Sequence, residues 1–192
     1  MARVAICGVA RTPIGKFRGS LSNLSAIELG VRAVTELLSR CNIDPSSGVV
    51  DELLFGQVLQ TGVGQAPARQ VALGAGLPNT IGATTINKVC GSSLKAVMMA
   101  ANSIKAGEYK VIIAGGMESM TNAPKFEKRD GDEKELVPSM VHDGLWDVYN
   151  DVHMGNTGEI VAKECNISRG KMDAFAARSQ NYAAQAEENG WF

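Results

Sequence analysis

The fold is decided by residues 91–114, whose sequence is GSSLKAVMMAANSIKAGEYKVIIA. Apolar side chains recur there at helical spacing up to about residue 106, and those on one face are Leu94, Val97, Met98, Ala101 and Ile104. Gly107 is a typical residue for ending a helix, and residues 111–114 form a continuous apolar run of the kind found in buried strands. Residues 91–114 are therefore predicted to be one helix followed by one strand.

The preceding residues repeat this alternation of strand and helix. The expected elements are a buried strand at 3–9, a helix that follows a capping box at Ser25 and Glu28, a strand near 52–59, a helix near 65–75 and a strand near 83–87. Such an alternation predicts right-handed βαβ units. We expect an α/β layered fold with helices on both faces of a mixed, mainly parallel sheet.

The pattern changes at about residue 117. Several Pro and Gly residues and the mixed-charge stretch 125–135 predict a long excursion with little regular structure up to about residue 150. Helical spacing returns from Asn156 to about 165 and from Met172 to Gly190. We therefore predict an N-terminal core at residues 1–117 and a second domain, rich in loops and helices, at residues 118–192.

Charge and composition exclude several classes of function. The 192 residues carry a formal net charge of −1, which disfavours binding to nucleic acid or to an anionic membrane. No apolar run approaches the length of a membrane span, and the N-terminus does not resemble a signal or transit segment. The four cysteines are too scattered for a disulfide scaffold or a zinc site. We expect a cytoplasmic protein without a bound metal.

Cys90 is the candidate for covalent chemistry. It lies between a predicted strand and the start of the strongest predicted helix, where unpaired N–H groups and positive partial charge favour a thiolate. Gly91, Ser92 and Ser93 are small enough to admit a thioester, and backbone N–H groups there could hold an oxyanion. The residues alone leave an alternative open, because most intracellular cysteines are small buried hydrophobic residues.

Several segments resemble one family in the same order along the chain. They are RTPIGKF at 11–17, GQAPARQ at 64–70, NKVCGS at 87–92, GGMESM at 115–120 and HMG at 153–155. Together they resemble thiolases, the acetyl-CoA acetyltransferases and 3-ketoacyl-CoA thiolases, over essentially the whole chain. The resemblance implies a thiolase-type core that lacks its final strand, followed by a truncated loop domain.

The resemblance also implies a mechanism and a pocket. Cys90 would take the acyl group of a coenzyme A thioester and pass it to a second acyl-CoA, with coenzyme A as substrate and no permanently bound cofactor. Leu145, His153 and Met154 match positions that line the acyl and pantetheine pocket, although by sequence alone His153 is an ordinary polar residue ahead of a helix. Glu118 is interpreted as a structural hydrogen-bond partner.

The remaining catalytic groups of the family lie in a half that this sequence does not contain. The resemblance therefore implies one subunit of a split thiolase of the acetyl-CoA C-acetyltransferase type, inactive without an obligate partner chain in a hetero-oligomer. Two alternatives stay open: a noncatalytic homologue that binds acyl-CoA or other proteins, and a fragment of a longer chain. The sequence leaves open the acyl chain length, the direction of the reaction and the residues that bind the nucleotide.

Overall fold

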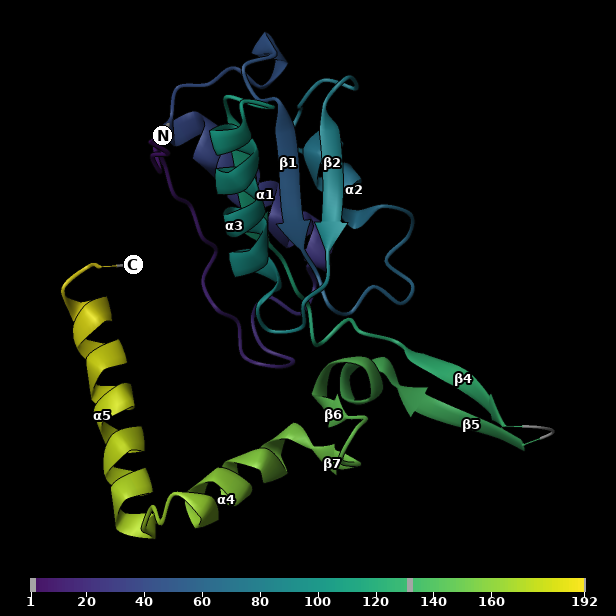
Figure 1. The fold of residues 1–192 in the computed structure, drawn as a ribbon, viewed down its shortest axis with the longest axis vertical. Coiled ribbons are helices and arrows are strands. Elements are labelled where there is room, and N and C mark those ends of the chain that lie inside the picture. The colour runs from purple at the N-terminus through teal and green to yellow at the C-terminus, as the bar shows by residue number, and fades with distance from the viewer. Residues whose placement is uncertain (1–2, 131–132, 192) are drawn as a thin grey trace. The chain divides into compact units, whose positions relative to one another are not determined.

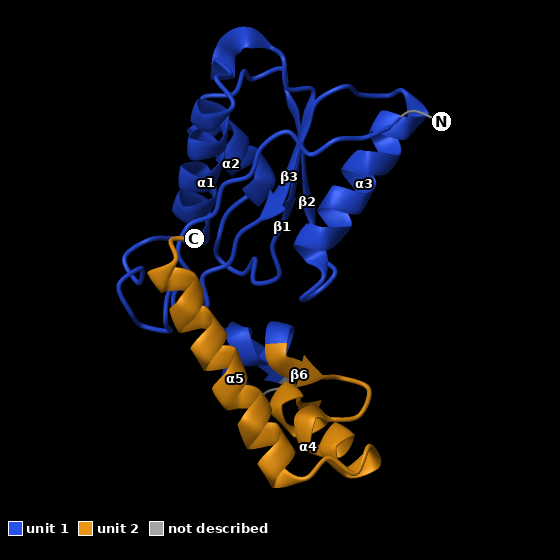
Figure 2. Ribbon diagram, turned by 90° about the vertical axis from the view of Figure 1, so that its left-hand side faces the viewer, with its two compact units in different colours: residues 1–144 blue, residues 145–192 orange. Residues whose placement is uncertain are grey.

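The computed structural model describes residues 3–130 and 133–191. The chain divides into two compact units, residues 1–144 and residues 145–192 (Figure 2). The domain boundary predicted at residue 117 concerns the family's domains and stays a prediction. Within the described residues, none of the helices is both long enough and apolar enough to cross a membrane.

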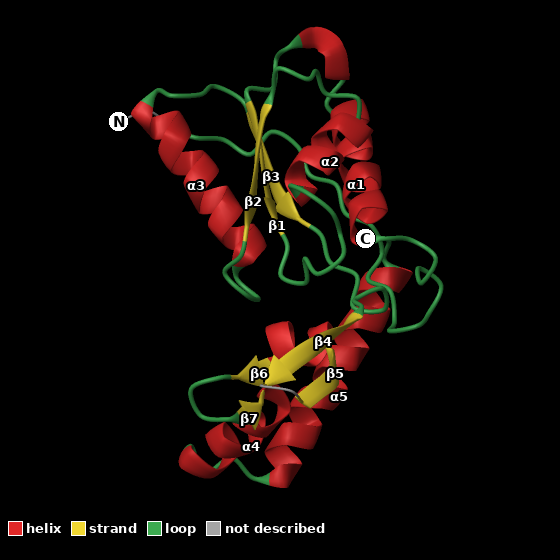
Figure 3. Ribbon diagram, turned by 90° about the vertical axis from the view of Figure 1, so that its right-hand side faces the viewer, coloured by secondary structure: helices red, strands yellow, loops and turns green. Residues whose placement is uncertain are grey.

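The first unit is built on a parallel sheet of three strands in the order β2-β1-β3. These strands are β1 (Glu52–Gly56), β2 (Gly82–Ile86) and β3 (Ile112–Gly116). Helices α1 (Ala26–Arg40) and α2 (Pro67–Gly74) cover one face of the sheet, and α3 (Ser92–Ala106) covers the other (Figures 1 and 3). A short 3-10 helix, η1 (Pro45–Ser47), precedes β1. The predicted α/β class is confirmed, with helices on both faces of a parallel sheet.

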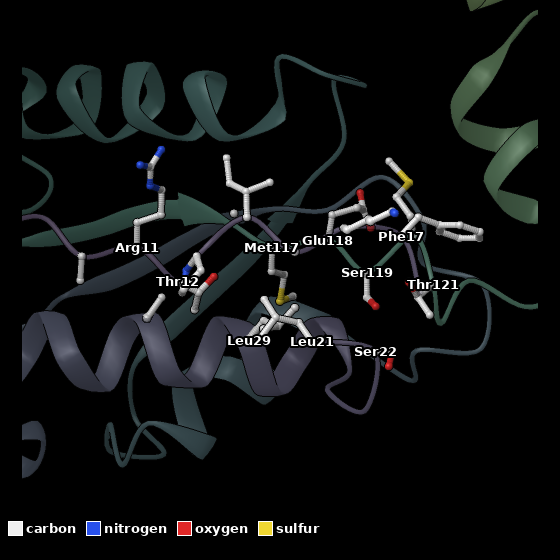
Figure 4. Close-up of a pocket in the computed structure, with 18 residues that line it drawn as sticks. Arg11, Thr12, Phe17, Leu21, Ser22, Leu29, Met117, Glu118, Ser119 and Thr121 are labelled. Atoms are coloured by element: carbon white, nitrogen blue, oxygen red, sulfur yellow. The ribbon is translucent and has the colours of Figure 1, made fainter. Parts of the chain in front are cut away.

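The larger core lies between the sheet and the pair α1 and α2. Its most buried side chains are Val34, Leu38, Leu53, Phe55, Ala68, Val71 and Ala72. Met117, just after β3, points toward Leu29 of α1 and toward Leu21 (Figure 4). Because both strands and helices contribute to this layer, the parallel strands are buried on the α1 side as such sheets require.

Helix α3 packs on the sheet with small residues and leaves its large ones outside. Ser92, Ala96 and Ala100 are buried, whereas Leu94 and Met98 are 66% and 50% exposed. The apolar stripe singled out in the sequence therefore does not face the sheet. Small side chains allow the helix to approach the strands closely, so Leu94 and Met98 stay exposed while Met99 packs beside the buried alanines.

Helix α1 begins with the predicted capping box, which the structure confirms. The Ser25 hydroxyl accepts a hydrogen bond from the Glu28 N–H, and the Glu28 carboxylate accepts one from the Ser25 N–H at 2.8 Å. Two N–H groups at the helix start are thereby satisfied. The same contacts, the Ser25 N–H first and the Ser25 hydroxyl second, lower the pKa of Glu28 below its ordinary value.

The strand predicted at residues 3–9 is not formed. These residues are extended without belonging to any sheet, and Ile6 and Val9 are 78% and 71% exposed. Alternation of apolar residues predicts a strand, but a strand also needs a hydrogen-bonded neighbour. In the part of the chain that the structure describes, no strand lies at the free edge of β3 to supply one.

The region after residue 117 has more regular structure than predicted. Strands β4 (Lys125–Asp130) and β5 (Glu133–Pro138) form an antiparallel hairpin, and a π-helix, η2 (Met140–Leu145), follows. The Oε1 atom of Glu127 in β4 lies 3.1 Å from the Arg129 Nε atom and 3.4 Å from the Lys134 Nζ atom. Because of its mixed charges, the stretch 125–135 was predicted to have little regular structure. Opposite charges on one face of a hairpin, however, also support strand pairing.

The second unit contains a small hairpin and two helices. The hairpin consists of β6 (Trp146–Asp147) and β7 (Val152–His153), and the helices are α4 (Met154–Glu164) and α5 (Arg169–Glu188). The predicted helical C-terminal third is confirmed. Helix α4 begins before the predicted Asn156, because the His153 side chain caps it by accepting the Gly155 N–H at 2.9 Å.

Glu118 connects the chain after β3 to the chain after β1. Its carboxylate accepts hydrogen bonds from the Val58 N–H at 2.9 Å and the Leu59 N–H at 3.3 Å. These contacts confirm the structural interpretation of Glu118. Burial raises the pKa of Glu118 above its ordinary value, and the backbone hydrogen bonds only partly oppose this shift.

We expect Glu28→Gln to destabilise the protein in a pH-dependent way. Because the folded pKa of Glu28 is lowered, its contribution is present above the unfolded value of about 4.5 and is lost as the pH falls through the folded pKa. Urea unfolding should therefore show a difference from the wild type at pH 7 that shrinks at lower pH. Glu159→Gln, at an exposed position, is the control; an equal pH dependence in both variants would contradict this role for the capping box.

We expect Glu118→Ala to lower the free energy of unfolding by about 1–3 kcal/mol, because the Val58 and Leu59 N–H groups lose their acceptor. Glu118→Gln retains an acceptor oxygen and should cost less. Chemical denaturation of the three proteins at one pH compares them. Equal stability of the alanine variant and the wild type would show that water replaces the carboxylate without loss.

Candidate active site

The candidate site begins with the turn between β2 and α3. The turn is fixed by the buried Ser92 hydroxyl, which accepts the Lys88 N–H at 2.8 Å and donates to the Val89 carbonyl oxygen at 2.6 Å. The Asn87 side-chain oxygen accepts the Val89 N–H at 2.9 Å. We call these three hydrogen bonds the Ser92 clamp. They hold the chain in one conformation immediately before the helix.

Val89 has a backbone conformation that its side chain disfavours. Its φ is +48°, in the left-handed region that β-branched residues rarely enter. Such a residue costs on the order of 1–3 kcal/mol and persists only when its surroundings fix it. The Ser92 clamp supplies that constraint at both the N–H and the carbonyl of Val89. The strained turn directs the chain so that the next residue, Cys90, is exposed.

The first turn of α3 rests directly on the ends of two strands. A Cβ atom on Gly56, the last residue of β1, would lie 2.7 Å from the Ser92 Cβ atom. A Cβ atom on Gly116, the last residue of β3, would collide with the Ser93 hydroxyl. Glycine is therefore required at both strand ends for this close approach. The helix start is thereby positioned over the carboxyl edge of the parallel sheet.

Cys90 occupies the position that a nucleophile needs. It directly precedes Gly91, the N-cap residue of α3, and no side chain caps this helix start. The Gly91 and Ser92 N–H groups donate to the Lys88 and Val89 carbonyl oxygens at 3.1 Å, so a bound negative charge has to be received by the Cys90 N–H or by the N–H groups that follow Ser92 in the first turn of α3. The exposure of Cys90 does not fit the alternative of a packed structural thiol. Its catalytic role stays a prediction.

The other predicted site residues lie in the second unit. Leu145 ends η2, His153 is the N-cap of α4, and Met154 is the first residue of α4. Trp146 pairs with His153 in the β6–β7 hairpin, and Leu145 and Met154 each adjoin one member of this pair in the chain. All three therefore belong to one end of this hairpin. The Nδ1 atom of His153 accepts the Gly155 N–H at 2.9 Å.

Cys90 does not line either of two hollows that are bordered by residues of the first unit. One, of about 380 Å³, is bordered by residues 10–17, by Leu21, Ser22, Leu29 and Ala33, and by residues 116–121 (Figure 4). The other, of about 790 Å³, lies along β3 and residues 3–10. Among the described residues no three His, Cys, Asp or Glu side chains converge as metal ligands would. On this unit Cys90 is therefore open to solvent.

Sequence reasoning located Cys90 but missed what positions it. Ser92 was interpreted only as a small residue, although it is 4% exposed and fixes the turn. The glycines at 56 and 116 each end an apolar run, a signal that could have indicated close packing at the strand ends. The conformation of Val89 has no signal in the sequence, because β-branched residues ordinarily avoid it.

Comparison with known proteins identifies the family to which the chain is similar. The family model described as "Thiolase, N-terminal domain" matches residues 4–192. Acetyl-CoA acetyltransferase 2 of Arabidopsis thaliana is 51% identical over 98% of this chain and 48% of its own length. The acetyl-CoA acetyltransferase of Cupriavidus necator is 50% identical over 100% of this chain and 50% of its own length. A probable acetyl-CoA acyltransferase of Staphylococcus aureus is 43% identical over the same shares.

The chain spans about half the length of the curated relatives it matches. The family match covers nearly all of the 192 residues, and the strand–turn–helix unit that presents Cys90 lies within it. This chain therefore belongs to the thiolase family and corresponds to its N-terminal domain.

Proposed function

We propose that this chain is the acyl-carrying half of a split thiolase, in which Cys90 forms an S-acyl intermediate and a partner chain supplies the second half. The observation that carries the proposal is the exposure of Cys90 at the uncapped start of α3, directly after a strained residue. Local strain of this kind is concentrated at functional sites. The relatives named acetyl-CoA acetyltransferase indicate the class of substrate.

The first step is transfer of an acyl group to the sulfur. The Cys90 thiolate attacks the carbonyl carbon of an acyl-CoA thioester, a new C–S bond forms, and the bond to the coenzyme A sulfur breaks. Coenzyme A leaves as a thiolate and takes up a proton. Negative charge on the thioester oxygen is stabilised by backbone N–H groups at the helix start, including that of Cys90. The nearby Ser93 and Gly91 present little bulk to the substrate.

The second step is assigned to a group of the partner half in this proposal. A second acetyl-CoA must lose a proton from the carbon next to its carbonyl, and the resulting enolate attacks the S-acyl carbonyl to form a carbon–carbon bond. A positioned base is required for this proton transfer. Glu118, two residues beyond the end of β3, is engaged with the Val58 and Leu59 N–H groups. The partner half therefore provides the base in this proposal.

The exposed apolar surface of α3 supports an obligate partner. Leu94, Val97 and Met98 of this helix are all exposed. Large exposed apolar patches mark sites of protein interaction. Because this surface belongs to the helix that begins beside Cys90, a partner packed on it would also bring its own groups toward the sulfur. The expected assembly is a hetero-oligomer with acyl-CoA as substrate.

Leu145, His153 and Met154 are assigned to the acyl and pantetheine pocket in this proposal. Their gathering at one end of the β6–β7 hairpin supports a shared role. Met154 and Leu145 offer apolar contact, while the ring of His153 is held by its bond to the Gly155 N–H. The acyl chain length and the direction of the reaction follow from contacts that the partner half completes.

The test uses the second half of the Cupriavidus necator acetyl-CoA acetyltransferase as a surrogate partner. We expect the mixture with acetyl-CoA to release coenzyme A and the chain alone to do so far more slowly. Cys90→Ser should lower the rate at least about 10³-fold, as loss of a nucleophile does in other enzymes. Cys165→Ser changes another exposed cysteine and should leave the rate unchanged. Mass spectrometry should find the acyl group on Cys90.

The contrary results are equally specific. Full activity of Cys90→Ser with the partner would remove Cys90 from the mechanism. Binding of acetyl-CoA without acylation of Cys90, with or without the surrogate, would instead indicate a noncatalytic binding protein. Equal activity of the chain alone and of the mixture would contradict the need for a second half.

The Ser92 clamp generates a separate prediction. Ser92→Ala leaves the Lys88 N–H without its acceptor and leaves the Val89 carbonyl only the backbone N–H of residue 92 as a donor, so we expect a loss of about 1–3 kcal/mol in the free energy of unfolding. Alkylation of Cys90 by iodoacetamide should also become slower, because the turn no longer holds the sulfur beside the helix start. Ser93→Ala changes the adjacent, exposed serine and should have a smaller effect on both. Equal effects of the two variants would contradict the clamp.

A further inference from the structure

The chain that follows β1 is fixed by polar side chains around Leu59. We call residues 57–61 the β1 exit segment. The Glu118 carboxylate accepts the N–H groups of Val58 and Leu59. The Gln57 side chain, which is 1% exposed, donates from its Nε2 atom to the Leu59 carbonyl oxygen at 3.1 Å. Both the N–H and the carbonyl of Leu59 therefore have side-chain partners, which hold this residue in place.

Asn87 links the β1 exit segment to the turn that presents Cys90. Its Oδ1 atom accepts the Val89 N–H at 2.9 Å, which is one bond of the Ser92 clamp. Its Nδ2 atom donates to the Val58 carbonyl oxygen at 3.5 Å. One amide side chain therefore contacts both the turn before α3 and the β1 exit segment, so a movement of the segment relative to the turn would disturb these hydrogen bonds.

The β1 exit segment also holds the π-helix η2. A Cβ atom on Gly144 would lie 3.2 Å from the Leu59 Cδ2 atom, closer than carbon atoms ordinarily pack. Leu59 itself is 3% exposed. The Thr61 hydroxyl adds a polar contact, because it donates to the Asp143 Oδ2 atom at 3.3 Å. Since η2 ends at Leu145, its last turn is held by an apolar contact and a hydrogen bond from this segment.

We propose that Leu59 is a positioning residue for the acyl-CoA substrate, because its contact with Gly144 fixes the end of η2 that carries Leu145. The inference rests on the proposed function, in which Leu145 lines the acyl and pantetheine pocket. The Leu59 side chain is buried, so it acts through η2 and not by touching the substrate. Because Asn87 ties the same segment to the Cys90 turn, Leu59 keeps the pocket residue at a fixed place relative to the nucleophile.

A purely structural role for Leu59 has different consequences. A packing contact without a positioning role would change the free energy of unfolding and leave the Michaelis constant KM unchanged. A contact that positions a binding residue raises KM, with little effect on kcat when the lost interaction is equal in the bound substrate and in the transition state. The Cys90 turn is held by its own three hydrogen bonds, so the reactivity of the sulfur should not change.

The test compares Gly144→Ala with the wild type, each as the full chain mixed with the second half of the Cupriavidus necator acetyl-CoA acetyltransferase. The φ of Gly144 lies outside the left-handed region, so alanine adds a carbon atom without backbone strain. That atom presses on the Leu59 Cδ2 atom. We expect KM for acetyl-CoA to rise about 5-fold and kcat to change less than about 2-fold, since small displacements of positioning groups weaken the bound geometry.

Two matched variants make the test specific. Leu59→Val removes the Cδ2 atom, so the double variant Gly144→Ala with Leu59→Val should regain most of the wild-type KM. Such a recovery is a non-additive effect of the kind that residues in contact show. Gly170→Ala adds a carbon atom in α5 where nothing lies within 4 Å, and should leave KM unchanged. Alkylation of Cys90 by iodoacetamide should proceed at the wild-type rate in all these variants.

Calorimetric binding of acetyl-CoA separates this inference from the proposed function. Acyl transfer with an unchanged KM in Gly144→Ala, no recovery in the double variant, or slower alkylation of Cys90 would overturn the positioning role and spare the function. Absence of transfer, together with acetyl-CoA binding that Gly144→Ala weakens and Leu59→Val restores, would support the positioning role and contradict the function. Failure of the wild-type mixture to bind acetyl-CoA would overturn both.

Discussion

The contact between the start of α3 and the ends of β1 and β3 is the constraint on which the site depends. Gly56 and Gly116 have no side chains there, so Ser92 and Ser93 lie directly against the strand ends. The buried Ser92 hydroxyl then fixes Lys88 and Val89. Because this contact prevents α3 from shifting along the sheet, it fixes the position of Cys90, the residue before the N-cap. Strain in Val89 is the cost of that placement.

The same sheet is incomplete at one edge. A groove of about 790 Å³ lies along β3, and residues 3–10 border it without strand partners. Exposed edges of parallel sheets are unusual because such strands are ordinarily covered on all sides. The outward face of α3, with Leu94 and Met98 exposed, is uncovered as well. Both features occur on the unit that presents Cys90, so the surfaces open to the proposed partner belong to the same unit as the proposed nucleophile.

Much of this fold could be predicted from local patterns. The capping box at Ser25 and the helix–strand unit at 91–114 are decided by nearby residues, and both are found in the structure. The prediction of a strand at 3–9 was wrong, because a strand needs a hydrogen-bonded neighbour and the local sequence does not specify that neighbour. The prediction of the apolar face of α3 was based on large apolar residues such as Leu94 and Val97. The structure buries Ala96 and Ala100 instead, because only small side chains allow the helix to lie so close to the sheet. The Ser92 clamp depends on contacts within a strained turn, such as that between Ser92 and Lys88, four residues before it. Hydrophobic periodicity along the sequence does not detect such contacts.

In the proposed split enzyme, the division of one catalytic site between two chains would place opposite demands on this half. Cys90 would have to be held in place before the partner arrives, and the Ser92 clamp holds its turn using residues 87–92 alone. The docking surfaces would have to stay open until then, and Leu94 and Met98 of α3 are exposed in this half. Because α3 begins beside Cys90, a partner packed on this helix would also restrain the turn that presents Cys90. Assembly and activation would then be the same physical event.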